Sequence, residues 1–164
     1  MLPLASSKGE DDEIVVRAAL PADIDRIADL LSDLAGKRLS VEDASNRFDL
    51  IAGEPDQELL VADAEGMVIG LLAFRIRYNI ESVSHYGEVA SIVVDGSWRT
   101  KGVGRRLIDH AEALARQRKC IGLWLVSGFG REAEAHKFYD RLGFERTGVR
   151  LVKTFAEPYP ESTR

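Results

Sequence analysis

Glycines and basic residues gather in the middle of the chain, between a short apolar run and an amphipathic segment. Residues 92–94 are Ile-Val-Val, which is typical of a buried strand, and apolar side chains recur at helical spacing over residues 105–116. The turn between them, residues 99–104, is Arg-Thr-Lys-Gly-Val-Gly, and Arg99, Lys101, Arg105 and Arg106 are expected to place cations around it. A helix N-terminus leaves N–H groups unpaired, and glycine lets an anion approach closely. The pattern predicts a site for a pyrophosphate or a 3′-phosphorylated nucleotide. A tight strand-to-helix turn with solvated cations is the alternative.

Two common phosphate-binding loops do not match this turn. The P-loop has the form Gly-x-x-x-x-Gly-Lys-Ser/Thr, which does not occur in the chain. A dinucleotide fingerprint would need a third glycine where Leu107 stands, and it normally lies near the start of a βαβ unit. Another kind of phosphate site is therefore predicted.

Two motifs occur in order along the chain. Arg99-x-x-Gly102-x-Gly104 follows a strand that ends in Val-Val-Asp, and residues 135–145 read Ala-His-Lys-Phe-Tyr-Asp-Arg-Leu-Gly-Phe-Glu. The first resembles the acetyl-CoA pyrophosphate loop of the GCN5-related N-acetyltransferase (GNAT) superfamily. The second is similar to that family's later motif, a helix that carries a tyrosine and ends at Leu-Gly-Phe. The resemblance extends over about residues 14–155.

The resemblance implies acetyl-CoA as the cosubstrate. In this family the sheet splays between two strands, here residues 87–94 and 122–127, and the pantetheine arm pairs with the backbone of the first strand. The residues then expected to contact acetyl-CoA are Ile92, Val93, Val94, Arg99, Thr100, Lys101, Gly102, Val103, Gly104, Arg105, Ser127 and His136. The three histidines are scattered, so no metal site is predicted.

The hydrophobic patterns predict an α/β fold with a mixed, mostly antiparallel sheet flanked by helices. Strands are expected at residues 14–19, 58–63, 67–78, 87–94, 122–127 and 148–155, and helices at 21–36, 41–53, 105–116 and 132–142. Ser40 and Asp43 resemble a capping box at the second helix, with aspartate in place of glutamate. A single N-acetyltransferase domain, residues 13–156, is expected between tails at residues 1–12 and 157–164.

Acetylation of an amine poses two proton problems. The amine is mostly ammonium at neutral pH, and the leaving thiolate must be neutralised. Tyr139 matches the family's helix tyrosine and is the predicted acid; a core aromatic is the alternative. Glu88 is the predicted base, direct or through water, and is expected beside an apolar acyl pocket; a solvent-facing strand residue is the alternative. His85 and Tyr86 are further candidates.

The chain departs from one branch of the family at Ser127. Ribosomal-protein N-terminal acetyltransferases carry a catalytic glutamate at about this place, so their mechanism is not implied here. Ser127 is a candidate for binding pantetheine or the acyl carbonyl, or else a turn residue at a strand end. His136 lies three residues before Tyr139 and either contacts CoA or is exposed. Cys120 has no histidine placed as its partner, which favours a structural role.

Composition limits the classes of function. A net charge of −5 argues against a general nucleic-acid binder, and a cationic acceptor is compatible with it. No apolar run approaches the ~20 residues of a transmembrane helix, and the acidic N-terminus is unlike a signal peptide. A cytoplasmic protein without a membrane partner is therefore expected.

The combined prediction is an acetyl-CoA-dependent N-acetyltransferase that acts by direct transfer on a primary amine of a small molecule. Two alternatives stay open. A protein N-terminal or lysine acetyltransferase would need an open groove beside residues 79–87. A non-catalytic acyl-CoA-binding regulator would keep the phosphate turn alone. Homodimers are common in the family, so a homodimer is also considered.

Overall fold

The computed structural model describes residues 14–127 and 132–155. The predicted tails, residues 1–12 and 157–164, lie outside these ranges, as do residues 128–131. The chain divides into two compact units, residues 1–125 and residues 126–164, which are described separately.

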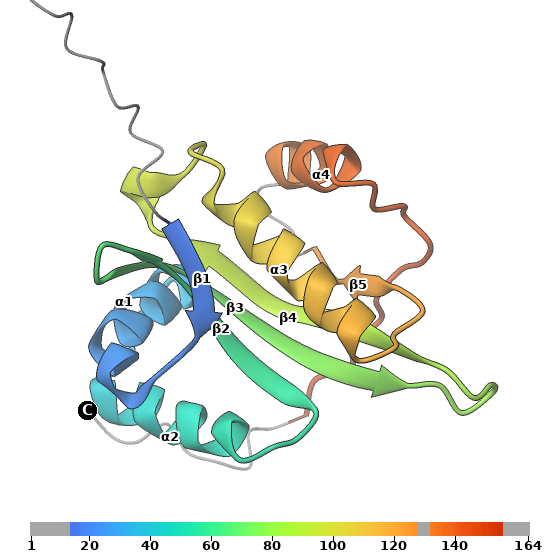
Figure 1. Ribbon diagram of the computed structural model, residues 1–164, viewed down its shortest axis with the longest axis horizontal. Helices are drawn as coiled ribbons and strands as arrows, with labels where there is room; N and C mark the ends of the chain where they lie inside the picture. The colour runs from blue at the N-terminus through green and yellow to red at the C-terminus, as the bar shows by residue number, and fades with distance from the viewer. Residues whose placement is uncertain (1–13, 128–131, 156–164) are drawn as a thin grey trace, which may run out of the picture. The chain divides into compact units, whose positions relative to one another are not determined.

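The first unit is built on a five-stranded sheet in the order β1-β2-β3-β4-β5 (Figure 1). The strands are β1 (Ile14–Ala18), β2 (Gln57–Ala64), β3 (Met67–Tyr78), β4 (His85–Val94) and β5 (Leu123–Leu125). All neighbours are antiparallel except β4 and β5, which are parallel. The predicted mixed, mostly antiparallel sheet is confirmed.

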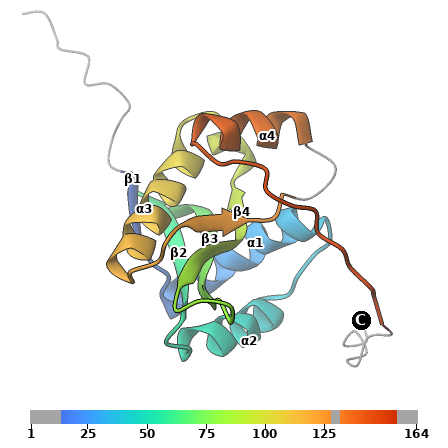
Figure 2. The ribbon, with the colours of Figure 1, turned by 90° about the vertical axis from the view of Figure 1, so that its right-hand side faces the viewer.

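Helices cover both faces of this sheet (Figure 2). The helix α3 (Val103–Gln117) packs on one face, where Gly70 of β3 lies against Leu107. The next residue, Leu71, points to the other face and belongs to the core formed with α1 (Ile24–Ala35) and α2 (Val41–Ala52). Because side chains alternate along a strand, β3 contributes to both layers of the core.

Local sequence signals set the helix ends. After the short 3-10 turn η1 (Pro21–Asp23), α1 runs to Gly36, which ends it with φ 66°. Ser40 caps α2 by accepting a hydrogen bond from the Asp43 N–H at 3.0 Å. In a full capping box the Asp43 carboxylate would accept from the Ser40 backbone N–H. That part of the prediction is wrong, because the carboxylate accepts from the Ser40 hydroxyl instead, at 2.9 Å. The shorter aspartate replaces the backbone contact that glutamate makes.

The predicted strand at residues 148–155 is wrong. These residues form no regular element, and their apolar side chains are open to solvent, with Leu151 90% exposed. A strand forms only where a sheet edge pairs with it, and the described sheet, β1 to β5, contains no strand from these residues. The strand predicted at residues 122–127 is also shorter, as β5 spans three residues.

The sheet splays beside β4. Strand β5 pairs with β4 only over Gly87–Val89. The next residue, Ala90, is the extra residue of a bulge, since Val89 pairs with Phe74 and Ser91 with Ala73. Beyond Ala90, the β5 side of β4 has no strand partner within residues 14–127. The splay expected from the family is therefore present as an open strand edge.

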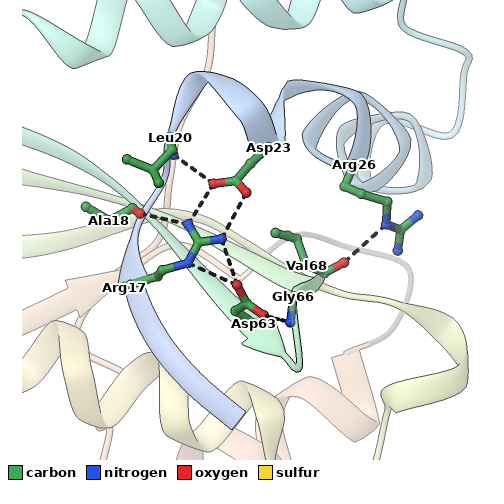
Figure 3. Close-up of polar contacts among 8 residues, drawn as sticks. All are labelled: Arg17, Ala18, Leu20, Asp23, Arg26, Asp63, Gly66 and Val68. Carbon is green, nitrogen blue, oxygen red and sulfur yellow. Dashed lines mark hydrogen bonds and ion pairs between the residues drawn. The ribbon is translucent and has the colours of Figure 1, made fainter.

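A charged cluster ties β1 to the start of the first helix (Figure 3). Arg17 of β1 donates to both carboxylate oxygens of Asp23, at 2.7 and 2.9 Å, and to Asp63 of β2 at 2.8 Å. Asp23 also accepts from the Leu20 N–H at 2.7 Å. The Arg17 hydrogen bonds hold the pKa of the Asp23 carboxyl below its usual range, against the opposing effect of its burial.

We expect Arg17→Met to lower the free energy of unfolding by about 2 kcal/mol, because it leaves two carboxylates without their cation. The value lies below that of a fully buried pair, since the Arg17 side chain is 29% exposed. Urea unfolding would measure it. As a control, Arg116→Met breaks an exposed helical pair with Glu112 and should cost only about 0.5 kcal/mol.

The same variant should reveal the pH dependence of this cluster. Because the folded pKa of Asp23 is lowered, its stabilisation is complete above the unfolded carboxyl value, about 3.9, and is lost as pH falls through the folded value. The stability difference between wild type and Arg17→Met should therefore shrink in acid. A difference that stays constant down to about pH 2 would contradict this account.

Candidate functional site

The turn after β4 is the best-defined part of the predicted site. Asp95 opens it by accepting from the Ser97 N–H at 2.9 Å, which caps the 3-10 turn η2 (Gly96–Trp98). Ser97 donates both hydroxyl and backbone hydrogen bonds to Asp95, and these lower the pKa of that carboxyl, with help from Arg26. The Arg26 guanidinium of α1 contacts Asp95 at 3.0 Å. The turn is thus anchored to the helical layer of the first unit.

The N-terminus of α3 faces open space. Its first helical hydrogen bond runs from the Arg106 N–H to the Gly102 carbonyl at 3.1 Å, so the N–H groups of Val103, Gly104 and Arg105 have no helical partner. Gly102 has φ 79°, a conformation that favours glycine, and a side chain there would meet nothing within 4 Å. These N–H groups and the helix dipole suit an anion.

Cations surround this turn as predicted, with one exception. Arg99, Lys101 and Arg105 are exposed, and the Lys101 ammonium lies 5.0 Å from the centre of the Trp98 ring. Arg106 instead points back to β1, where it donates to the Ile14 carbonyl at 3.5 Å. The expectation that Arg106 belongs to the turn is therefore wrong, because its side chain lies along the sheet edge.

Thr100 has a strained backbone. Its φ is 64°, a region that β-branched residues rarely adopt, and its hydroxyl donates to the Arg99 carbonyl at 2.6 Å. Such conformations cost of the order of 1–3 kcal/mol and occur where the surrounding structure holds them, often at binding loops. The residues around Thr100 therefore hold the turn in one backbone conformation.

The open edge of β4 leads directly into this turn. Val93 is buried in the core, while Ile92 and Val94 are half-buried, as expected for residues that contribute backbone rather than side chains to a ligand. The unpaired side of an extended strand can hydrogen-bond an extended chain as an added strand. A molecule with an amide-containing arm and a phosphate end fits this edge and turn together.

Glu88 is buried, at 5% exposure, but its surroundings differ from those expected. The predicted apolar pocket is not what borders the carboxylate, because Arg75 contacts it through two hydrogen bonds, at 2.5 and 2.9 Å, and Arg77 lies 3.3 Å away. These hydrogen bonds raise the pKa of Arg75. The spacing of Arg75 and Arg77, two residues apart, could have indicated these neighbours from the sequence, since it places both side chains on one face of β3.

The two other candidates beside Glu88 have structural partners. The His85 ring nitrogen Nε2 lies 2.8 Å from the Arg118 carbonyl, and the ring packs against Tyr78. The Tyr86 ring lies so close to Gly122 that a side chain at that glycine would come within 2.8 Å of it. Both residues therefore help to hold β4 beside its neighbours.

The second unit contains Ser127, His136 and Tyr139, the last two on α4 (Glu132–Arg141). The α4 helix ends at Gly143, with φ 83°, where the Phe144 N–H bonds the Tyr139 carbonyl at 3.1 Å. The Tyr139 ring contacts Phe138 and Phe144. Burial raises the pKa of the Tyr139 phenol, which keeps it protonated at neutral pH. Ser127 and His136 are half-buried.

The described residues contain no group of three or more histidine, cysteine, aspartate or glutamate side chains placed to hold a metal ion. Cys120 is a free thiol whose pKa is raised by burial, which makes it a poor nucleophile. None of the helices in residues 14–127 and 132–155 is long and apolar enough to cross a membrane.

An open central strand edge, followed by a glycine-containing anion turn at a helix N-terminus, defines a protein that binds an extended phosphorylated cosubstrate. The model of the acetyltransferase (GNAT) family matches residues 24–144. The chain therefore belongs to the GNAT family of acetyl-CoA-dependent N-acetyltransferases, and the resemblance seen in the sequence is confirmed.

Two relatives match most of the chain. An aminoalkylphosphonate N-acetyltransferase of Salmonella typhimurium is 25% identical over 84% of this chain and 89% of its own length. A glucosamine 6-phosphate N-acetyltransferase of Dictyostelium discoideum is 28% identical over 86% of this chain and 90% of its own length. The names of both proteins describe small-molecule amines as acceptors.

The fold is shared with a solved aminoglycoside N-acetyltransferase in complex with CoA. Its TM-score is 0.77, with 19% identity over 88% of this chain and 95% of that chain. Acetyl-CoA is the donor of the family, and the turn and strand edge of this chain suit it.

Proposed function

We propose that this protein transfers an acetyl group from acetyl-CoA directly to the primary amine of a small molecule. The observation that carries the proposal is the open edge of β4, from Ala90 to Val94, which leads through η2 into the turn at residues 99–105 and the N-terminus of α3. An open strand edge can bind an amide-containing arm, and a helix N-terminus can bind a pyrophosphate. Acetyl-CoA carries both groups, so an edge that ends at a phosphate site suits it better than it suits a simple nucleotide.

Acetyl-CoA, when bound, supplies an activated acetyl thioester. The backbone of Ile92, Val93 and Val94 would bind its pantetheine arm, and the N–H groups and cations at residues 99–105 would bind its pyrophosphate. Ser127 and His136 remain candidates for further contacts. The assignments on β4 rest on its open edge and on the family motif; the Val94 carbonyl already accepts a hydrogen bond from Arg99 Nε at 3.3 Å.

Two side chains are proposed for the proton transfers. Tyr139 would protonate the departing sulfur, as the family motif implies; the burial that raises its pKa keeps the proton on the phenol at neutral pH but also makes it a weaker acid. Glu88 would accept the proton of the amine. Its Oε2 atom contacts both Arg75 and Arg77, whereas Oε1 accepts only from Arg75 Nη2, at 2.9 Å, among the described residues, so Oε1 is the oxygen proposed to take the proton.

A small-molecule acceptor is favoured by the two relatives, both named for small amines. The loop at residues 79–84 is closed on itself, since the Asn79 N–H bonds the Ser84 carbonyl at 3.0 Å. It thus forms a compact hairpin end rather than an extended wall for a peptide. A cytoplasmic location, a homodimer and one domain over residues 13–156 stay predictions.

The test is a thiol-release assay with acetyl-CoA and two acceptor panels, one of small primary amines and one of peptides with free N-termini or lysines. We expect turnover with members of the first panel, with acetylated product identified by mass spectrometry. Turnover confined to peptides would replace the proposal with a protein acetyltransferase. Acetyl-CoA binding in calorimetry without turnover in either panel would replace it with a regulator.

A further inference from the structure

Two arginines and one carboxylate share a face of the sheet near the splay. Arg75 of β3 pairs directly with Glu88 of β4, and Arg77 lies two residues further along the same face. The parallel neighbour of Glu88 on β5 is Trp124. Leu71, four residues before Arg75, points to the core beneath α1 and α2, so this arginine pair lies on the helical α1/α2 face of the sheet, opposite α3.

The charge of this cluster is unbalanced. Two guanidinium groups meet one carboxylate, so a net positive charge remains in a chain whose total charge is −5. The carboxylate is buried, whereas the side chains of Arg75 and Arg77 are 39% and 52% exposed. The two guanidinium groups are therefore partly open to solvent, and the buried Glu88 carboxylate holds them in place.

Hydrogen-bond donors remain available on both arginines. Arg75 uses Nε and Nη2 for Glu88, and within the described residues its Nη1 has no hydrogen-bond partner. Arg77 contacts Glu88 through Nε alone, and no partner for either Nη atom occurs in residues 14–127 or 132–155. The Arg77 guanidinium lies 6.0 Å from the centre of the Trp124 ring, which restricts its position. Two guanidinium groups that are held in position and have free N–H donors are suited to binding an oxyanion.

The cluster is placed beside the reacting end of the donor site. A ligand whose phosphates lie at the N-terminus of α3 and whose arm follows β4 backwards reaches Ala90, where the open edge begins. Glu88 is two residues further, roughly 7 Å along the strand. An amine that attacks there has Arg75 and Arg77 on the neighbouring strand.

We propose that Arg75 and Arg77 bind a phosphate or phosphonate group of the acceptor, so that the substrate is a phosphorylated or phosphonate-bearing primary amine. Three Nη atoms of Arg75 and Arg77 have no hydrogen-bond partner among the described residues, and a phosphorus oxyanion has three oxygens to accept from them, whereas a carboxylate has two. This inference rests on the proposed acetyltransferase function, because it assigns the acceptor of that same site.

The test compares four amines of similar size: O-phosphoethanolamine, 2-aminoethylphosphonate, β-alanine and ethanolamine. In wild type we expect kcat/KM for the two phosphorus compounds to exceed that for ethanolamine by at least about tenfold. Arg77→Gln should lower that ratio by about tenfold, toward one, as expected for the loss of one charged partner. Arg77 is chosen because removing Arg75 would leave the buried Glu88 without its main cation.

Two control variants and two further measurements separate this inference from the proposed function. Arg116→Gln removes an exposed arginine of α3 and should leave the ratio unchanged. Arg77→Lys keeps the charge and should retain part of the preference. Calorimetric titration with O-phosphoethanolamine measures binding without turnover, and circular dichroism confirms that Arg77→Gln is folded.

The outcomes are distinct. Turnover of ethanolamine equal to that of the phosphorus compounds, or a ratio unchanged in Arg77→Gln, would overturn the subsite and leave the acetyltransferase intact. Binding that depends on Arg77 without acetylation of any amine would retain the subsite and overturn the proposed function. An equal dependence on Arg77 with β-alanine would overturn the choice of a phosphorus oxyanion. Neither turnover nor Arg77-dependent binding would overturn both.

Discussion

Replacement of Gly102 by glutamate is expected to abolish acetyl-CoA binding, with an affinity loss of at least about 100-fold. Gly102 is the N-cap of α3 and has φ 79°, so a side chain is strained there. The added carboxylate would extend into the open space in front of the helix N-terminus and repel the phosphates. Isothermal titration of wild type and variant with acetyl-CoA measures the effect.

The matched control is Gly36→Glu. Gly36 also has a positive φ, 66°, and open space around it, but it ends α1 and has no place in the proposed site. This variant should show the same backbone strain, of the order of 1 kcal/mol, with unchanged acetyl-CoA affinity. Equal affinities for wild type and a folded Gly102→Glu protein would show that the phosphates bind elsewhere.

The second large effect is expected for Tyr139→Phe. This substitution removes one hydroxyl and keeps the ring contacts with Phe138 and Phe144, so α4 should stay folded. If the phenol protonates the departing sulfur, kcat should fall roughly 10²- to 10⁴-fold while acetyl-CoA affinity is unchanged. A thiol-release assay gives kcat, and calorimetry gives the affinity.

Tyr78→Phe is the control for this experiment. The Tyr78 hydroxyl bonds Asp56 at 3.2 Å at an exposed position, and its removal should leave kcat within about twofold of wild type. A Tyr139→Phe enzyme that keeps more than about a third of wild-type kcat would remove Tyr139 from the catalytic residues. Its role would then be packing against Phe144.

Several parts of the fold follow from local sequence. The helix ends at Gly36 and Gly143 are set by a backbone conformation that glycine adopts at little cost. The turn from Glu65 to Gly66 is similar, since both residues have positive φ, as a two-residue hairpin of type I′ requires. Such signals depend on a few neighbouring residues, which is why the sequence predicts them.

Other features depend on partners far along the chain. Residues 148–155 are rich in apolar and β-branched side chains, which is typical of a strand, but strand formation also needs a sheet edge to pair with. The prediction of an apolar pocket beside Glu88 was wrong for the same reason. The carboxylate contacts Arg75, which is 13 residues away, and that contact exists because β3 and β4 pair in one particular register.

The sequence by itself indicated the family, the order of the elements as far as α4, and the turn at residues 99–104 that is proposed to bind an anion. The turn was predictable because the φ of Gly102 and the unpaired N–H groups of α3 arise within a few consecutive residues. Only the tertiary structure decided that β5 leaves β4 at Val89, that Arg106 turns away from the turn, and that Arg75 and Arg77 meet Glu88. Those features are set by strand register and by packing between distant segments, which no short stretch of sequence specifies.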